Sequence, residues 1–272
     1  MKELLPYMYP LLVGFARYFA VAGLAFVVYY VFFPNTFSRN KIQKKFAGRK
    51  DFWREVAHSM QSTVTITAVA LLFLLTPIRE HTLFYENLSE YPLWWLPVSV
   101  VLALVVHDTY FYWMHRTLHH PKLYRRMHLV HHKSVNPSPW ASYSFHISEA
   151  VMEGMIAPVI LFLIPLHGTA LLLFATASFI INVYGHLGYE IAPRWLRRTW
   201  LFEVLNTSVH HNLHHSKFNG NYGLYFRVWD RLMGTELPEY VQEYDRVQAR
   251  RTEKQTSGKG ISVIPMVGKN DL

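Results

Sequence analysis

The sequence predicts an all-α integral membrane protein with about four transmembrane helices and a cytoplasmic, histidine-rich helical cap. Its residues are 51% hydrophobic, and the apolar residues gather into long runs separated by short basic segments, a pattern typical of multi-pass membrane proteins. The chain contains no cysteine, which excludes thiolate-bound haem, cysteine-held iron–sulfur clusters and disulfides. A soluble all-helical protein is the alternative, because the mean hydropathy is only slightly positive.

Four apolar stretches are candidates for membrane-embedded segments. They are residues 7–33, 63–76, 93–106 and 151–184. The first carries a single charge, Arg17, and no small-residue cleavage pattern follows it, so it predicts a membrane helix and not a signal peptide. The third continues as an apolar-aromatic stretch through Trp113. The fourth is too long for one helix and is interrupted at residues 164–169 by Pro165 and Gly168, which predicts a helical hairpin.

The basic segments predict how the chain is oriented. Lys and Arg concentrate in residues 38–54, 115–128, 193–198 and 245–254, next to apolar stretches or in the tail. Nucleic acid binding could explain such patches, but beside membrane spans they more often mark cytoplasmic loops, and we expect no nucleic-acid partner. Residues 79–91, which hold more acids than bases, then lie on the opposite side. This topology places the histidine-rich segments together on the cytoplasmic face.

Three histidine sets have the i, i+3 and i+4 spacing that puts side chains on one face of a helix. They are His115 with His119, His128 with His131 and His132, and His211 with His214 and His215. An aromatic belt at the membrane interface would use mainly Trp and Tyr. These histidines are more than one metal ion can bind, and we therefore expect two metal ions. His58, His81, His146 and His167 stand alone, while His107 and His120 lie off the shared face, and none of the six is expected to bind metal.

A stripe along the third span links these ligands to two further residues. Asp108, Tyr112, His115 and His119 follow at helical spacing. Ligating histidines usually donate their second ring nitrogen to a carboxylate or carbonyl, so Asp108 is a candidate for that supporting contact, with Tyr112 beside it. An interfacial Asp that caps a helix or pairs with an Arg is an equally good interpretation.

Ligand type alone leaves the metal open, because imidazole suits zinc, copper, iron and nickel. The zinc-protease signature H-E-x-x-H is absent. A transporter would place its ligands near the middle of the membrane, whereas these histidines lie at the ends of spans. The remaining hypotheses are a redox-active metal pair, a non-redox di-zinc enzyme, and a protein that transports or buffers metal.

Three histidine boxes carry a family resemblance. The segments are HRTLH (residues 115–119), HLVHH (128–132) and HNLHH (211–215), with flanks at 108–116 and 216–235. In these segments the chain resembles the membrane-bound fatty acid hydroxylase and sterol desaturase superfamily, especially bacterial members similar to C5 sterol desaturases. The resemblance implies a di-iron centre that uses O2 to hydroxylate or desaturate a lipid of sterol or fatty acyl type, although zinc could occupy a purified form. It also adds His186 as a ligand and His210 as a supporting residue.

Hydropathy, composition and charge, with the resemblance for the catalytic region, predict the remaining parts. Residues 1–92 would form N-terminal membrane helices, 93–240 the catalytic region, and 241–272 a polar tail. Residues 218–223 would form a loop over the site that positions His215, while Trp229, Asp230 and Arg231 pack the cap. The sequence has no nucleotide-binding, haem or ferredoxin motif, so electrons must come from an external cytochrome b5-like protein or a ferredoxin and reductase. Basic residues on the cytoplasmic face could bind this donor, and they could equally bind anionic lipid headgroups. They are Arg125, Arg126, Lys133 and those within residues 194–198.

Overall fold

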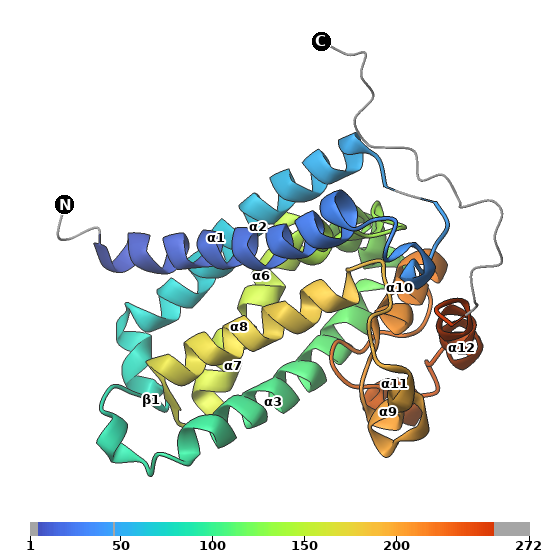
Figure 1. Ribbon diagram of the computed structural model, residues 1–272. Helices are drawn as coiled ribbons and strands as arrows, with labels where there is room; N and C mark the ends of the chain where they lie inside the picture. The colour runs from blue at the N-terminus through green and yellow to red at the C-terminus, as the bar shows by residue number, and fades with distance from the viewer. Residues whose placement is uncertain (1–4, 46, 253–272) are drawn as a thin grey trace.

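A computed structural model describes residues 5–45 and 47–252, and these residues form an almost entirely helical protein (Figure 1). Within them, four helices are long and apolar enough to cross a membrane. They are α1 (Leu5–Phe26, continued by the π-helix Val27–Phe32), α2 (Arg49–Leu74), α3 (Trp95–Leu118) and α8 (Gly168–Gly185). The predicted all-α fold with about four membrane helices is therefore confirmed. Many of their large apolar side chains are exposed, as expected for helices that face lipid.

Helix α2 is much longer than the apolar run from which it was predicted, residues 63–76. It begins at Arg49, where the Asp51 carboxylate accepts a hydrogen bond from the backbone amide of Gly48 at 2.9 Å. Its polar first half carries the buried residues Glu55, Ser59 and Ser62 toward the protein interior. Hydropathy marks only the lipid-facing half of such a helix, and the N-terminal cap defines its true start.

The predicted hairpin has one complete arm and one broken arm. The first arm consists of two short helices, α6 (Ile147–Gly154) and α7 (Ile156–Leu163), and the second is α8. The turn between them contains the strand β2 (Leu166–His167), which pairs in parallel with β1 (Phe84–Tyr85), so the chain reverses at the predicted position. The short arm places α6 against α2 inside the protein.

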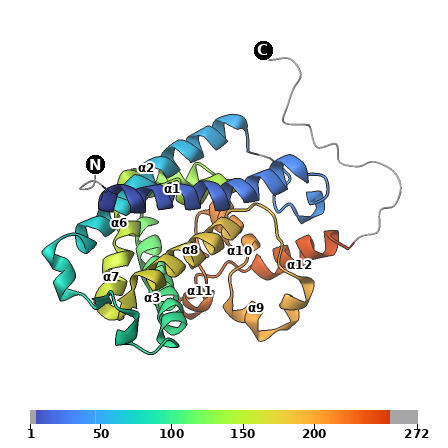
Figure 2. The ribbon, with the colours of Figure 1, turned by 60° about the vertical axis from the view of Figure 1, so that its left-hand side comes forward.

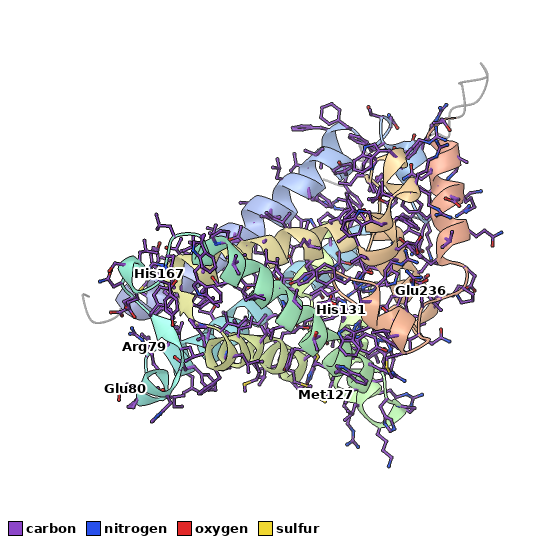
Figure 3. All side chains as sticks on the ribbon, turned by 90° about the horizontal axis from the view of Figure 1, so that it is seen from below. Arg79, Glu80, Met127, His131, His167 and Glu236 are labelled. Atoms are coloured by element: carbon purple, nitrogen blue, oxygen red, sulfur yellow. The ribbon has the colours of Figure 1, made fainter. Side chains whose placement is uncertain are left out.

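Three short 3₁₀ helices are Ser38–Asn40, Pro77–His81 and Leu88–Glu90, and most of the other helices form a cap at one end of the membrane helices (Figures 1 and 2). Their bounds are α4 Pro121–Leu123, a π-helix Tyr124–His128, α5 Leu129–His132, a 3₁₀ helix Pro139–Tyr143, a 3₁₀ helix Arg194–Arg198, α9 Trp200–Val204, α10 Ser208–Lys217, α11 Val228–Leu232 and α12 Tyr240–Arg250. In Figure 3, Arg79, Glu80 and His167 lie at the end of the molecule opposite this cap. The loop that was predicted to face away from the histidines is thus far from them.

Residues 241–250, assigned to a polar tail on sequence grounds, belong to helix α12 and to the core of the cap. Tyr244 and Val247 are fully buried in a cluster with Phe202 and Val209. This amphipathic helix therefore shields α10, on which three of the predicted ligands lie. The rest of the predicted tail, from residue 253 onward, lies outside the described residues.

Candidate metal centre

Nine buried or half-buried histidines converge where the cap meets the membrane helices. They form a first group of His115, His119, His128, His132 and His214, and a second group of His131, His186, His211 and His215. Within each group the candidate ligand atoms all lie within 4.8 Å of one another. The structure therefore brings together all nine histidines that the sequence analysis selected as ligands.

The two groups do not follow the three sequence motifs. His131 and His132 are neighbours on α5 but belong to different groups, and His214 and His215 divide in the same way on α10. Successive residues on a helix point about 100° apart, so each of these helices supplies both groups at once. The groups are consequently adjacent, and the rings of His132 and His215 have centroids 4.9 Å apart.

In the first group, backbone carbonyls fix the tautomer of two histidines. The Nδ1 atom of His115 donates to the Tyr222 carbonyl at 2.9 Å, and that of His214 donates to the Gly220 carbonyl at 2.8 Å. Because carbonyl oxygens only accept, Nδ1 carries the proton and Nε2 presents a lone pair. The Nε2 atom of His115 lies 3.0 Å from that of His128, and the Nε2 atom of His214 lies 3.1 Å from that of His132.

The second group has the same arrangement. The Nδ1 atom of His186 donates to the Asn182 carbonyl at 2.9 Å, which leaves Nε2 as a lone pair. This Nε2 lies 3.0 Å from that of His211 and 3.2 Å from that of His215, and the latter two are 3.1 Å apart. His131 completes the group, with its Nε2 3.4 Å from that of His186.

These distances match those expected around a bound metal ion. Two ligand nitrogens, each about 2.0–2.1 Å from an ion, are about 3.0 Å apart in octahedral and about 3.4 Å apart in tetrahedral geometry. Burial also lowers the pKa of His186 and of His214 to about 4, so that metal binding at neutral pH displaces no proton from them. The residues therefore fit two metal ions.

The comparisons with known proteins point to one family. The family model for fatty acid hydroxylase matches residues 100–235, a segment that contains all nine histidines. The chain belongs to the fatty acid hydroxylase and sterol desaturase superfamily.

Relatives from this superfamily include sterol desaturases and oxidases. The chain is 31% identical over 238 residues to the Delta(7)-sterol 5(6)-desaturase ERG3B of Gibberella zeae, covering 84% of this chain and 69% of the relative. It is 33% identical over 184 residues to the lathosterol oxidase of Homo sapiens, covering 67% of this chain and 60% of the relative. A Delta(7)-sterol 5(6)-desaturase of Leptosphaeria maculans is 28% identical and covers 97% of this chain. No solved structure matches the chain significantly.

A carboxylate that the sequence analysis missed supports the first group of this superfamily site. Glu149 on α6 is 1% exposed, and its Oε1 lies 2.7 Å from Nδ1 of His128. Burial raises the pKa of Glu149 well above its ordinary value, and a metal ion bound by His128 would oppose that shift. The sequence feature that could have pointed to Glu149 is its position, as an acid just before the apolar run of residues 151–184. Linear spacing could not connect it to a histidine 21 residues earlier.

The three residues predicted to support the ligands have other partners. The Oδ1 atom of Asp108 accepts from the backbone amides of Tyr225 and Phe226 at 2.7 and 3.2 Å, so it anchors the cap where a histidine contact was predicted. The Tyr112 hydroxyl lies 2.9 Å from the Thr235 hydroxyl. His210 belongs to neither group, and its Nε2 is 3.8 Å from the Asp230 carboxylate. Asp108 and Tyr112 thus connect α3 to the cap, whereas both ring nitrogens of His210 are buried without a hydrogen bond.

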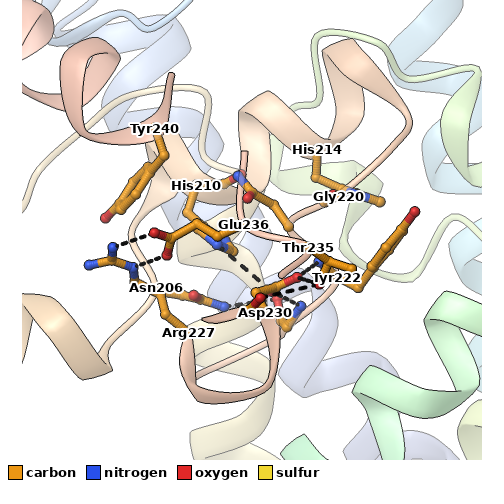
Figure 4. A network of polar contacts seen from close by, with 12 residues as sticks. Asn206, His210, His214, Gly220, Tyr222, Arg227, Asp230, Thr235, Glu236 and Tyr240 are labelled. Carbon is orange, nitrogen blue, oxygen red and sulfur yellow. Dashed lines mark hydrogen bonds and ion pairs between the residues drawn. The ribbon is translucent and has the colours of Figure 1, made fainter. Parts of the chain in front are cut away.

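A polar network in residues 220–235 positions two of the ligands (Figure 4). The Asp230 carboxylate accepts from the backbone amides of Tyr222 and Gly223 at 2.8 and 2.7 Å and from the Thr235 hydroxyl at 2.7 Å. This fixes the segment whose Gly220 and Tyr222 carbonyls bind His214 and His115. Gly220 has φ of +96°, a conformation that favours glycine. The loop was predicted to position His215; in the structure its Gly220 and Tyr222 carbonyls instead accept hydrogen bonds from His214 and His115.

An apolar cavity of about 400 Å³ lies between the membrane helices and reaches residues that adjoin the histidine groups. Phe111 and Asn182 form part of its wall, and both contact the histidines. The Phe111 ring is 4.9 Å from that of His115, and the Asn182 carbonyl binds His186. Tyr9 and Leu172 also line it and are 64% and 46% exposed on the outer surface, so the cavity extends from the lipid-facing side toward the histidines.

Proposed function

We propose that the chain is a membrane-bound non-haem di-iron oxidoreductase that uses O2 to hydroxylate or desaturate a C–H bond of a sterol-type lipid. The observation that carries this proposal is the pairing of two adjacent histidine groups with a lipid-sized apolar cavity. Membership in the superfamily and the names of the relatives support the reaction class and the sterol-type substrate. When bound, the two irons would supply O2 activation and the removal of hydrogen from an unactivated carbon.

The nine histidines would hold the two ions, and the surrounding residues would control what reaches them. Neutral imidazoles provide ligands without a competing charge, so the ions keep their electrophilic character. Phe111 stands on one side of the centre, and Phe145, whose ring is 5.0 Å from that of His131, stands on the other. These rings exclude water and offer no N–H or O–H group to an oxidant.

Electrons would arrive from a separate protein on the cytoplasmic face. Arg125, Arg126 and Lys133 are exposed and belong to the same short stretch of chain as His128, His131 and His132. A cationic surface this close to the centre suits an acidic carrier such as a cytochrome b5-like protein or a ferredoxin with its reductase. This placement requires the cap to face the cytoplasm, as the distribution of basic residues favours.

The decisive experiment is metal analysis and Mössbauer spectroscopy of protein grown on iron-57, combined with a turnover assay. About two irons per chain with coupled spectra, and O2-dependent oxidation of a sterol in the presence of a reductase, are the expected results. Two zincs with no iron, even after anaerobic reconstitution, would overturn the proposal in favour of a non-redox enzyme. Metal flux into vesicles without turnover would instead indicate a transporter.

A further inference from the structure

Helix α11 of the cap packs against the side of a membrane helix and not beyond its end (Figure 2). Its Trp229 donates a hydrogen bond to the Thr109 hydroxyl of α3 at 3.1 Å, and the Trp229 ring lies 5.5 Å from that of Trp113. At 1.5 Å per residue, Thr109 and Trp113 lie about 21–27 Å from the first residue of α3. Because the hydrocarbon core of a bilayer is about 30 Å thick, α11 is at the depth of the membrane boundary.

The outward side of α11 and the neighbouring α9 is apolar. Val228 and Leu232, four residues apart on α11, are exposed, and so is Trp200, the first residue of α9. Arg231 of α11 forms an ion pair of 3.0 Å with Glu203 of α9, so the two helices share one surface. An exposed surface with Trp and aliphatic side chains at this depth is typical of helices that lie in the membrane interface.

A cleft of about 550 Å³ with a positively charged lining lies beside this surface. It is formed between the 3₁₀ helix Arg194–Arg198 and α12, and Arg194, Trp195, Arg197, Arg198 and Asp245 line it. Nε of Arg197 donates to the Asp245 carboxylate at 3.0 Å, so these two charges compensate each other. Arg194 and Arg198 are exposed, and their side chains form no ion pair with any residue in the described part of the chain.

We propose that this cleft binds the phosphate headgroup of an anionic phospholipid, while Trp200 and Leu232 insert among the acyl chains beside it. The planar guanidinium group matches the geometry of phosphate oxygens, and it can donate two parallel hydrogen bonds to them. Trp195, which lies in the cleft lining, has the amphipathic ring that is enriched at headgroup level. The site therefore provides charge for the headgroup and apolar surface for the chains.

This inference goes beyond the proposed function and divides the basic residues of the cap between two partners. An acidic electron carrier at residues 194–198 would require the adjoining Trp200 and Leu232 to face water, although they lie next to a helix docked at membrane depth. Arg125, Arg126 and Lys133 have no such apolar neighbour in the argument above and remain the surface for the carrier. Lipid at the cleft would stabilise α9 and α12, which pack together against α10.

The first test measures the depth of the α11 surface. The chain contains no cysteine, so a single nitroxide label can be attached to Leu232→Cys in the full-length protein. In nanodiscs of phosphatidylcholine and phosphatidylglycerol, power-saturation EPR compares collisions with O2, which concentrates in lipid, and with a water-soluble nickel complex. Leu232→Cys should favour O2, as should Val105→Cys, which is exposed on α3. Arg246→Cys, exposed on α12, should favour nickel.

The second test measures the lipid that the cleft retains. Native mass spectrometry of protein released from the same nanodiscs counts the bound phosphatidylglycerol and phosphatidylcholine. The double variant Arg194→Gln with Arg198→Gln should lower retention of phosphatidylglycerol by about tenfold or more and leave phosphatidylcholine unchanged, because each cation near the membrane attracts anionic lipid. The matched control is Lys44→Gln with Lys45→Gln, which removes the same charge from exposed positions outside the cleft and should retain both lipids normally.

Three results would overturn the inference. A label at Leu232 that collides mainly with nickel would place this surface in water, where an acidic protein would be the fitting partner. Unchanged retention of phosphatidylglycerol in the cleft variant would refute the headgroup site, and equal losses in the cleft and control variants would show only a general effect of charge. Neither measurement uses turnover or bound metal, so a failure of the oxidase proposal would leave both outcomes valid.

Discussion

Replacement of Glu149 by Gln should weaken metal binding in the first histidine group and leave the second group intact. The Glu149 carboxylate is 2.7 Å from Nδ1 of His128, which places it about 7 Å from a metal ion held at the opposite ring nitrogen. At an effective dielectric constant of about 20, a carboxylate and a divalent ion attract each other by about 5 kcal/mol at that distance. The cost of burying the carboxylate offsets part of this attraction.

The expected net loss is about 10–100-fold in affinity, or about 1.4–2.7 kcal/mol, as is typical for partners that orient a ligating histidine. Competition with a chromogenic chelator would measure the affinity of each ion in the purified protein. Glu55→Gln is the matched control, because Glu55 is also fully buried but bonds to Ser134 and Ser138 and to no histidine. Metal affinities equal to those of the unmodified protein in Glu149→Gln would refute the role of Glu149, and equal losses in both variants would show a general effect of removing buried charge.

Three further substitutions test the rest of the site and its scaffold. His131→Ala should release the metal of the second group and abolish turnover while the protein remains inserted; full turnover would refute the ligand assignment. Asp230→Ala leaves two amides and a hydroxyl without their acceptor and should lower the free energy of unfolding by about 3 kcal/mol, measured by denaturation of the purified protein. In Gly154→Ala the new Cβ would lie 2.9 Å from Cβ of Val69, so overpacking between α6 and α2 should cost about 1–3 kcal/mol; an unchanged melting temperature would contradict this packing.

The fold and eight of the nine candidate ligands could be predicted from local patterns in the sequence, whereas His186 was added only by the family resemblance. Apolar length marks membrane helices, and i, i+3 and i+4 spacing marks histidines that share a helical face. His107 and His120 were set aside by the same geometry. In the structure the ring of His107 instead contacts Tyr225, while His120 caps α4 by accepting from the Lys122 amide. His146 and His167 likewise cap α6 and α8, as expected of isolated histidines.

Several contacts around the ligands were not predictable, because they join segments far apart in the chain. Asp108 lies at the correct helical spacing from His115, yet its carboxylate binds backbone amides 117 and 118 residues later. Glu149 has no periodic relation to any ligand and reaches His128 only because α6 folds back against α2. Of the four acceptors that orient ligands, only the Asn182 carbonyl lies at helical spacing from its histidine, His186. The Tyr222 and Gly220 carbonyls and the Glu149 carboxylate lie on other segments, and spacing along one helix carries no information about them.

The division of adjacent histidines between the two groups explains why the boxes contain doubled histidines. A single ion could be held by residues on one face, such as His128 and His132. A helix that contributes to two ions side by side must present two directions, as α5 and α10 do, and neighbouring residues provide them about 100° apart. His131 beside His132 and His214 beside His215 perform this function. Each ion would also connect segments more than 80 residues apart, as the contact between His132 and His214 shows, so metal binding and the folding of the cap would be thermodynamically coupled.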